Sequence, residues 1–344
     1  MGILDVRCPH CGKNRNVDAS YYQRSVLCPR CKQTFSVKAA LEVKKQLIGQ
    51  VIEGKYHLRE LLREGGFALV YRAEEIATGQ VVRPVAVKLI YPDPQTPRTA
   101  TPPEELAAVL RMSHPNIVSA YSAGICKLCN VTWLYLVMEL AEESLEDHIR
   151  HSTLDPREAG EFTEHIASAL AYLHKDPDRL VHRDVKPANI LRFKEGWKLA
   201  DFGLAFAMER MRNNENQPSG TDKYMPPEGF EGKITPAWDM WAFGVMLTEA
   251  LTGHHPFESD RHIVYAISQL KPQLPPDLPM PFLEIIRGCL IQKRALRWTA
   301  PQVLEALHAA HGLRVSLSAY RWTLNERMRQ LTKPQEQRKR GSTR

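Results

Sequence analysis

The stretch Val181-His182-Arg183-Asp184-Val185-Lys186-Pro187-Ala188-Asn189-Ile190, followed twelve residues after Asn189 by Asp201-Phe202-Gly203, decides the fold of this chain. Between the two motifs, residues 190–193 and 197–200 are short apolar runs around Lys194-Glu195-Gly196, a pattern that predicts a hairpin. That hairpin would bring Asp184, Asn189 and Asp201 into one small volume. These three groups suit phosphoryl transfer, in which one carboxylate takes the proton of a hydroxyl while the second carboxylate and the amide oxygen hold magnesium against a triphosphate.

His182-Arg183-Asp184 through Asn189, followed by Asp201-Phe202-Gly203, resembles the catalytic core of the protein kinase family. The resemblance implies that Asp184 is the catalytic base and that Asn189 and Asp201 bind magnesium. Lys186, two residues after the Asp, is what the serine/threonine branch of the family carries at this place. Any one of these residues could instead be a cap or turn residue, but the ordered set at family spacing favours the catalytic interpretation.

A second kinase motif, the Gly-rich loop over the ATP phosphates, is matched imperfectly by residues 63–71. Arg63 stands where the first family glycine is expected, and Ala68 replaces the third. The resemblance implies that residues in and next to this loop bind the nucleotide. They are Leu62, Gly65, Gly66, Ala68 and Val70.

The strand expected at residues 85–90 carries Lys88, and its alternation puts Ala86 and Lys88 on the same face. The resemblance implies that Lys88 binds the α and β phosphates and pairs with a glutamate of the next helix. We assign that role to Glu105 rather than Glu104, because Glu104 closes a capping box that begins at Thr101.

Residues 134–141 are expected to form a buried strand that leads into the hinge of the kinase fold. The resemblance places Met138 behind the adenine and has the backbones of Glu139 and Ala141 hydrogen-bond to it. Ala86 and Leu191 complete the implied adenine site.

The activation segment implied by the resemblance runs from Asp201 to the Pro-Pro-Glu triplet at 226–228 and includes a substrate-facing turn at Gly220-Thr221. Because few hydroxyl residues lie in it, we hypothesise that Glu209 or Glu215 partners Arg183 in place of an activating phosphate. Residues 159–174 predict a helix, and residues 238–244 resemble the central helix of the larger lobe. The resemblance also implies that Arg297 forms a buried pair with Glu228.

The N-terminus carries two matched cysteine pairs, Cys8-Pro9-His10-Cys11 and Cys28-Pro29-Arg30-Cys31, separated by sixteen residues. This spacing predicts a structural zinc site of four thiolates that leaves no open coordination position. Two disulfides are the alternative, which the absence of an export signal disfavours. The segment resembles zinc ribbons, with Tyr21-Tyr22 and Phe35 expected beneath the cysteine turns. A further pair, Cys126 and Cys129, is interpreted as two turn cysteines rather than half of a second metal site.

The formal charge of +7 is unevenly distributed, because both ends are basic and residues 41–313 are acidic. The basic tail is interpreted as a solvated charge run in preference to a surface that binds nucleic acid. Residues 240–248 form the apolar run nearest to a membrane span and are far shorter than a span requires. Met1 to Val6 lack the features of a signal peptide, so we expect a soluble, cytoplasmic protein.

The sequence therefore predicts an α+β, bilobal protein-kinase-like fold, with a β-rich N-lobe and an α-rich C-lobe, preceded by a small zinc ribbon. The expected parts are a ribbon at 1–40, a linker at 41–55, a kinase domain at 56–313 and a basic tail at 314–344. The expected activity is that of a signalling serine/threonine kinase that uses ATP, Mg²⁺ and structural Zn²⁺ and acts on protein hydroxyls. The alternatives are a weakly active or inactive kinase-fold scaffold, and a protein that binds nucleic acid through its ribbon and tail.

Overall fold

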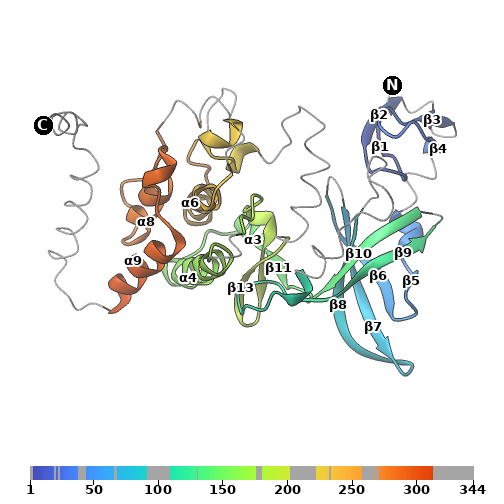
Figure 1. The fold of residues 1–344 in the computed structure, drawn as a ribbon, viewed down its shortest axis with the longest axis horizontal. Helices are drawn as coiled ribbons and strands as arrows, with labels where there is room; N and C mark the ends of the chain where they lie inside the picture. Colours follow the sequence, from blue (N-terminus) through green and yellow to red (C-terminus); the bar gives the residue numbers. More distant parts are fainter. Residues whose placement is uncertain are drawn as a thin grey trace, which may run out of the picture. The chain divides into compact units, whose positions relative to one another are not determined.

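The computed structural model describes most of the chain, and Figure 1 shows it as a ribbon. The described residues are 3–18, 21, 24–37, 44–65, 68–90, 109–129, 131–175, 180–201, 222–231, 234–257, 267 and 271–312. The chain divides into two compact units, Met1–His148 with His182–Gly220 and Ile149–Val181 with Thr221–Arg344. None of the helices in the described part of the chain is both long enough and apolar enough to cross a membrane.

The first unit begins with two small antiparallel hairpins (Figure 1). The paired strands are β1 (Ile3–Arg7) with β2 (Asn14–Asp18), and β3 (Ser25–Leu27) with β4 (Thr34–Ser36). Phe35 is buried with four valines and the cysteines of both hairpins, as the sequence predicts. The prediction for Tyr21 is wrong: this side chain is 41% exposed and lies under the guanidinium of Arg24, because the valines of the strands already fill the small core. Tyr22 lies outside the described residues.

A six-stranded antiparallel sheet follows in the order β5-β6-β7-β8-β10-β9 (Figure 1). Its strands are β5 (Val51–Ile52), β6 (Tyr56–Glu64), β7 (Ala68–Ala77), β8 (Gln80–Ile90), β9 (Ala120–Leu128) and β10 (Val131–Met138). Alternation along the strands gives the sheet two apolar faces. One face carries Leu69, Tyr71, Val85, Val87, Leu89, Trp133, Tyr135 and Val137. The other face carries Ala68, Val70, Ala86, Ile90, Leu136 and Met138.

Part of the segment predicted as a linker packs against this sheet. Residues 44–47 are helical, and Leu47 is fully buried in the cluster that lines the first face. The hydroxyl of Tyr71 donates to the carbonyl of Lys44 at 3.0 Å, and strand β5 pairs with β6. Leu47, the one apolar residue of this short helix, is therefore part of the core of the six-stranded sheet.

A second, three-stranded sheet of the same unit contains β11 (Glu143–Ser144), β12 (Ile190–Phe193) and β13 (Gly196–Leu199). Strands β12 and β13 form the hairpin predicted from the sequence, with the second strand shifted one residue toward the N-terminus. This hairpin returns the chain from Asn189 to Asp201, and the N–H of Ala200 donates to the carbonyl of Asn189 at 2.8 Å.

The second unit is helical (Figure 1). Its longer helices are α4 (Pro156–Leu173), α6 (Pro236–Thr252), α8 (Phe282–Cys289) and α9 (Ala300–Gly312). Helix α4 begins three residues before the predicted start because Asp155 and Glu158 form a capping box with Pro156 in the first turn. Helix α6 packs against α4 and α8 and is apolar on nearly all sides, in agreement with its predicted place as a buried central helix.

The same unit contains the predicted pair of Arg297 and Glu228. The guanidinium of Arg297 donates to the two carboxylate oxygens of Glu228 at 2.6 and 3.0 Å, and both side chains are buried. Three further donations satisfy the remaining guanidinium hydrogens, to the carbonyls of Ala237, Ile291 and Gln292. Removal of either partner would leave the other charge buried and unpaired, which typically costs about 3–5 kcal/mol.

Candidate active site and candidate metal centre

The residues 182–189, here called the catalytic loop, are held in place by a buried histidine. His182 donates from Nε2 to the carbonyl of Ala200 at 2.8 Å and accepts at Nδ1 from the N–H of Asp184 at 3.3 Å. Arg183, between them, has φ of 67°, in the left-handed region that costs a non-glycine residue about 1–2 kcal/mol. The structure therefore stores backbone strain next to Asp184, as functional loops often do.

Asp184, Lys186 and Asn189 form one hydrogen-bonded cluster in this loop. The ammonium of Lys186 lies 2.9 Å from Oδ1 and 2.7 Å from Oδ2 of Asp184. Asn189 donates from Nδ2 to Oδ2 of Asp184 at 2.9 Å and to its backbone carbonyl at 2.8 Å. Both contacts are made by the nitrogen of the Asn189 side-chain amide. The oxygen of the same amide is not used in them, and oxygen is the atom type that Mg²⁺ prefers. The arrangement presents a carboxylate, a cation and an amide oxygen together.

Lys88 and Asp201 form an ion pair in the same unit. Nζ of Lys88 lies 2.8 Å from Oδ2 of Asp201, and the Lys88 side chain is 8% exposed. Loss of solvent around the carboxyl raises the pKa of Asp201, but the charge and the hydrogen bond of Lys88, with smaller effects of His182 and Lys186, outweigh it. The pKa of Asp201 therefore lies below its usual value, and the group is a carboxylate at neutral pH. Its backbone, like that of Arg183, is left-handed, with φ of 67°.

An apolar cluster lies on the Lys88 face of the six-stranded sheet, and it contains five of the residues predicted to bind the nucleotide. They are Val70, Ala86, Met138, Ala141 and Leu191. Met138 pairs with Ala86 and Val70 pairs with Lys88 in neighbouring strands, so the cluster adjoins the lysine. Sequence reasoning missed its other members, Val118, Leu140, Phe193 and Ala200. No motif marks these four residues, because any apolar side chain fills such a position.

Other residues predicted to bind the nucleotide lie around this cluster. Ala68 is buried in a neighbouring cluster with Ile90 and Leu136, whereas Leu62 is largely exposed at the end of β6. The N–H of Gly65 donates to the carbonyl of Ala68 at 2.8 Å and closes the described part of the loop.

Glu139 is held by three polar contacts. Its carboxylate accepts from the N–H of Ser119 at 2.7 Å and from Nζ of Lys198 at 2.7 Å, and its own N–H donates to the carbonyl of Ser119 at 3.1 Å. The backbone N–H of Glu139 is thus already hydrogen-bonded. Its backbone carbonyl is therefore the group that we expect to bind the adenine.

Several predicted residues lie outside the part of the chain that the structure describes. They are Gly66, Glu105, Phe202, Gly203, Glu209, Glu215, Gly220 and Thr221. The expected pair of Lys88 with Glu105 and the expected partner of Arg183 therefore stay predictions.

Sequence reasoning also missed the partners of Arg63. Its guanidinium donates from Nη1 to the carbonyl of Ala188 at 2.6 Å and from Nη2 to the carboxylate of Glu146. Glu146 belongs to the short helix α3 (Leu145–Ile149), 83 residues further along the chain. No local spacing relates the two residues, so only the folded chain brings them together.

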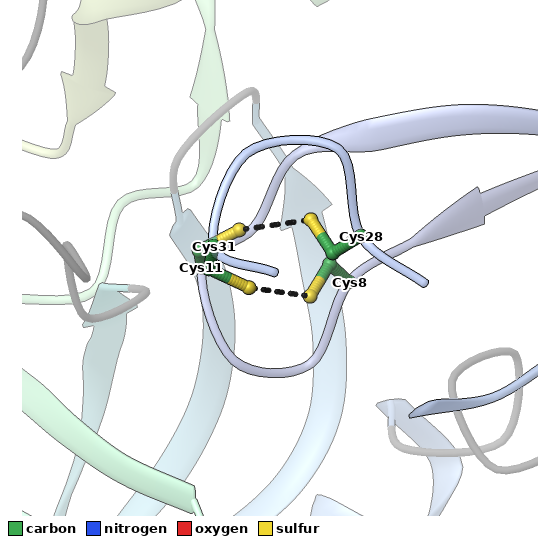
Figure 2. Close-up of side chains that lie close together, drawn as sticks. All are labelled: Cys8, Cys11, Cys28 and Cys31. Carbon is green, nitrogen blue, oxygen red and sulfur yellow. Dashed lines mark hydrogen bonds between the residues drawn. The ribbon is translucent and has the colours of Figure 1, made fainter. Parts of the chain in front are cut away.

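The four N-terminal cysteines converge from the turns of the two hairpins (Figure 2). Their sulfur atoms all lie within 4.8 Å of one another, with Cys8 to Cys31 at 3.7 Å and Cys11 to Cys28 at 3.6 Å. A disulfide requires about 2.05 Å, so the alternative of two disulfides is not formed. Four thiolates around Zn²⁺ at about 2.3 Å lie about 3.8 Å apart, which matches both distances. The residues present fit a tetrahedral metal site.

Both cysteine turns have the same backbone. The N–H groups of Gly12 and Lys32 donate to the carbonyls of Cys8 and Cys28, and both residues have a positive φ, of 71° and 57°. Each turn thus aims its two sulfur atoms at one point.

Cys126 and Cys129 stand apart from this cluster. Cys126 lies within β9 and Cys129 in the following turn, and both pack against the core of the six-stranded sheet. Burial raises the pKa of the Cys126 thiol to about 12. Among the described residues, the one group of three or more His, Cys, Asp or Glu side chains that could hold a metal ion is the four N-terminal cysteines, and Cys126 and Cys129 do not belong to it.

Comparison with known proteins agrees with this geometry. The family model of the protein kinase domain matches residues 56–308. The serine/threonine-protein kinase PrkC of Bacillus subtilis is 32% identical over 273 residues, which cover 76% of this chain and 41% of the relative. The serine/threonine-protein kinase PknA of Mycobacterium tuberculosis is 33% identical over 267 residues, which cover 73% of this chain and 60% of the relative. The chain thus spans about half the length of these curated relatives.

Proposed function

The chain belongs to the protein kinase family, and we propose on that premise that it transfers the γ-phosphate of ATP to serine or threonine hydroxyls of protein substrates. The single observation that carries this proposal is the cluster of Asp184, Lys186 and Asn189 in the catalytic loop, with Lys88 and Asp201 paired in the same unit. The relatives named above are serine/threonine kinases, and Lys186 stands where that branch carries a lysine.

Asp184 would accept the proton of the substrate hydroxyl as the oxygen attacks the γ-phosphorus. Lys186, 2.7 Å from Asp184, would lie beside the transferred group and offset part of its negative charge. The oxygen of Asn189 and the carboxylate of Asp201 are hard donors that would hold Mg²⁺, which when bound neutralises charge on the phosphate oxygens.

Lys88 would bind the α and β phosphates, and its burial strengthens that interaction because little water competes for the ammonium. The apolar cluster around Ala86 and Met138 would enclose the adenine, with the backbones of Glu139 and Ala141 fixing its orientation. Leu62, Gly65, Gly66 and Ala68 would cover the nucleotide from the other side. Glu105 would pair with Lys88 in the active state.

We further propose that the four-cysteine cluster holds a structural Zn²⁺. The sulfur distances support this assignment, and four protein ligands leave no coordination position for a substrate. All seven cysteines are free thiols in the structure, which suits the reducing environment of the cytoplasm, where we place the chain.

The experiment that tests the kinase activity follows phosphate from γ-labelled ATP into a generic protein substrate, with Asp184→Asn as the variant. We expect the wild-type chain to label serine and threonine and the variant to lose at least about a hundredfold in rate, the usual contribution of a general base.

Asp277→Asn is the matched control, because Asp277 is an exposed aspartate of the second unit and the same atoms are exchanged. Equal labelling by wild type and Asp184→Asn would reject the assigned base. No labelling by the wild type would support the alternative of an inactive scaffold.

A further inference from the structure

Arg63 is the residue at which this chain departs from the Gly-rich loop of its family, and the structure gives its side chain a defined place. It lies near the end of β6, opposite Val70 of β7, just after an irregularity in the pairing of the two strands. Val70 belongs to the apolar cluster assigned to the adenine. Arg63 therefore lies on the strand that precedes the Gly-rich loop, beside a residue of the proposed nucleotide site.

The guanidinium of Arg63 joins this strand to the catalytic loop. One donor reaches the carbonyl of Ala188 at 2.6 Å, and the other reaches the carboxylate of Glu146. Ala188 directly precedes Asn189, whose amide is bonded to Asp184, and it lies in the short 3-10 helix Pro187–Asn189. One side chain therefore connects the Gly-rich strand with the segment that carries the proposed base and a proposed magnesium ligand.

A planar guanidinium can make both contacts at once because its donors point in fixed, diverging directions. The glycine that the family places here has no side chain and could make neither contact.

We propose that Arg63 is a positioning residue that ties the Gly-rich strand to the catalytic loop over a bound nucleotide and so slows release of that nucleotide. This inference rests on the proposed function, since it takes the nucleotide site to lie between the two segments. Both partners are about two-fifths exposed, with side-chain exposures of 37% for Arg63 and 38% for Glu146, so the effect is modest.

The test measures the dissociation rate of a fluorescent ADP analogue with Mg²⁺ from the full chain, by displacement with excess ATP in a stopped-flow instrument. We expect Arg63→Gly to release the analogue about tenfold faster, as the loss of a charged hydrogen bond and a part-exposed ion pair implies. Arg63→Lys keeps the charge but cannot reach both partners, and we expect an intermediate rate. Glu146→Gln removes the charge of one partner and is expected to accelerate release as well.

Arg59→Gly is the matched control. Arg59 lies on the same strand and pairs with Glu74 at 2.5 Å, but that partner is on β7 and not in the catalytic loop. If the substitutions acted merely by weakening β6, both would change the release rate alike. The proposed tie predicts a faster release for Arg63→Gly alone.

Two results would overturn the inference while leaving the proposed function intact. One is release from Arg63→Gly at the wild-type rate, and the other is tighter binding of the analogue by this variant, which would mean that Arg63 obstructs the site. A wild-type chain that binds no nucleotide would reject the proposed function and this inference with it.

Discussion

Asp201 and Arg183 show how single residues bear the strain of the site. Both adopt a left-handed backbone, which side chains other than glycine rarely do. Asp201 follows the hairpin that begins after Asn189, and its carboxylate lies 2.8 Å from the buried ammonium of Lys88. The left-handed backbone of Asp201 costs free energy. The surrounding structure holds it in this conformation, in which its carboxylate contacts Lys88, 113 positions earlier in the sequence.

The ion pair of Lys88 and Asp201 makes a pH-dependent prediction. In Lys88→Met the attraction and the hydrogen bond of the ammonium are lost while the loss of solvent remains, so the pKa of Asp201 should rise. An NMR titration of aspartate carboxyl carbons in both proteins would measure this change. An unchanged pKa would show that Lys88 does not hold the carboxylate.

The same pair contributes to stability with a defined sign. Because the folded-state pKa of Asp201 is depressed, its contribution is present above the unfolded value of about 3.9 and is lost as pH falls through the folded-state pKa. The difference in unfolding free energy between wild type and Lys88→Met should therefore shrink as the solution is acidified through that range.

Which residues of the site the sequence could predict depends on how local their signals are. Asp184, Asn189 and Asp201 stand in short motifs, and the predicted hairpin between them is confirmed. The contact of Arg63 with Glu146 was not predictable, because it joins residues that share no element and no spacing. Tyr21 was wrongly placed because aromatic character alone does not say which of several apolar residues fills a small core.

At the scale of elements, alternation in the strands was the most reliable signal. It placed Ala86 and Lys88 on one face of β8 and left Val85, Val87 and Leu89 for the opposite core, as the structure has them. The short helix at 44–47 lies within a helical pattern, residues 39–50, that was interpreted as a linker, because the pattern alone does not show that Leu47 is buried.

The two cysteine turns provide a matched pair of element-scale substitutions. Gly12 and Lys32 occupy the same left-handed position, and lysine pays a steric cost there that glycine avoids. Lys32→Gly should strengthen zinc binding by a few-fold, and Gly12→Ala should weaken it by a similar factor, since each kilocalorie is worth about fivefold. Competition with a chromophoric chelator would measure both affinities. Equal affinities of all three proteins would show that turn strain is not coupled to the metal.

At the scale of the whole molecule, the chain combines a kinase domain with a small four-cysteine module. The two parts differ in the source of their stability. The kinase match covers residues 56–308 and includes a large apolar interior. In its described part, the core of the four-cysteine module consists of four valines, one phenylalanine and the cysteines, which is too small to fold on hydrophobic burial alone. Its metal would therefore supply most of its folding free energy.

This difference predicts a selective effect of metal removal. With a strong zinc chelator, amide hydrogens of β1 to β4 should lose protection from exchange, whereas those of β6, β7 and β8 should keep it. Hydrogen exchange followed by mass spectrometry resolves the two regions in the intact chain. Retained protection in all four ribbon strands after chelation would contradict a structural metal.

The central claim is that Asp201, Asn189 and Lys88 form one site for magnesium and a nucleotide. The most direct measurement is the affinity of the chain for ATP with and without Mg²⁺, in the wild type, in Asp201→Asn and in the exposed control Asp277→Asn. The account predicts that Mg²⁺ tightens ATP binding in the wild type and the control, and that this increment disappears in Asp201→Asn because one hard oxygen donor has lost its charge. An increment of the same size in Asp201→Asn would contradict the account.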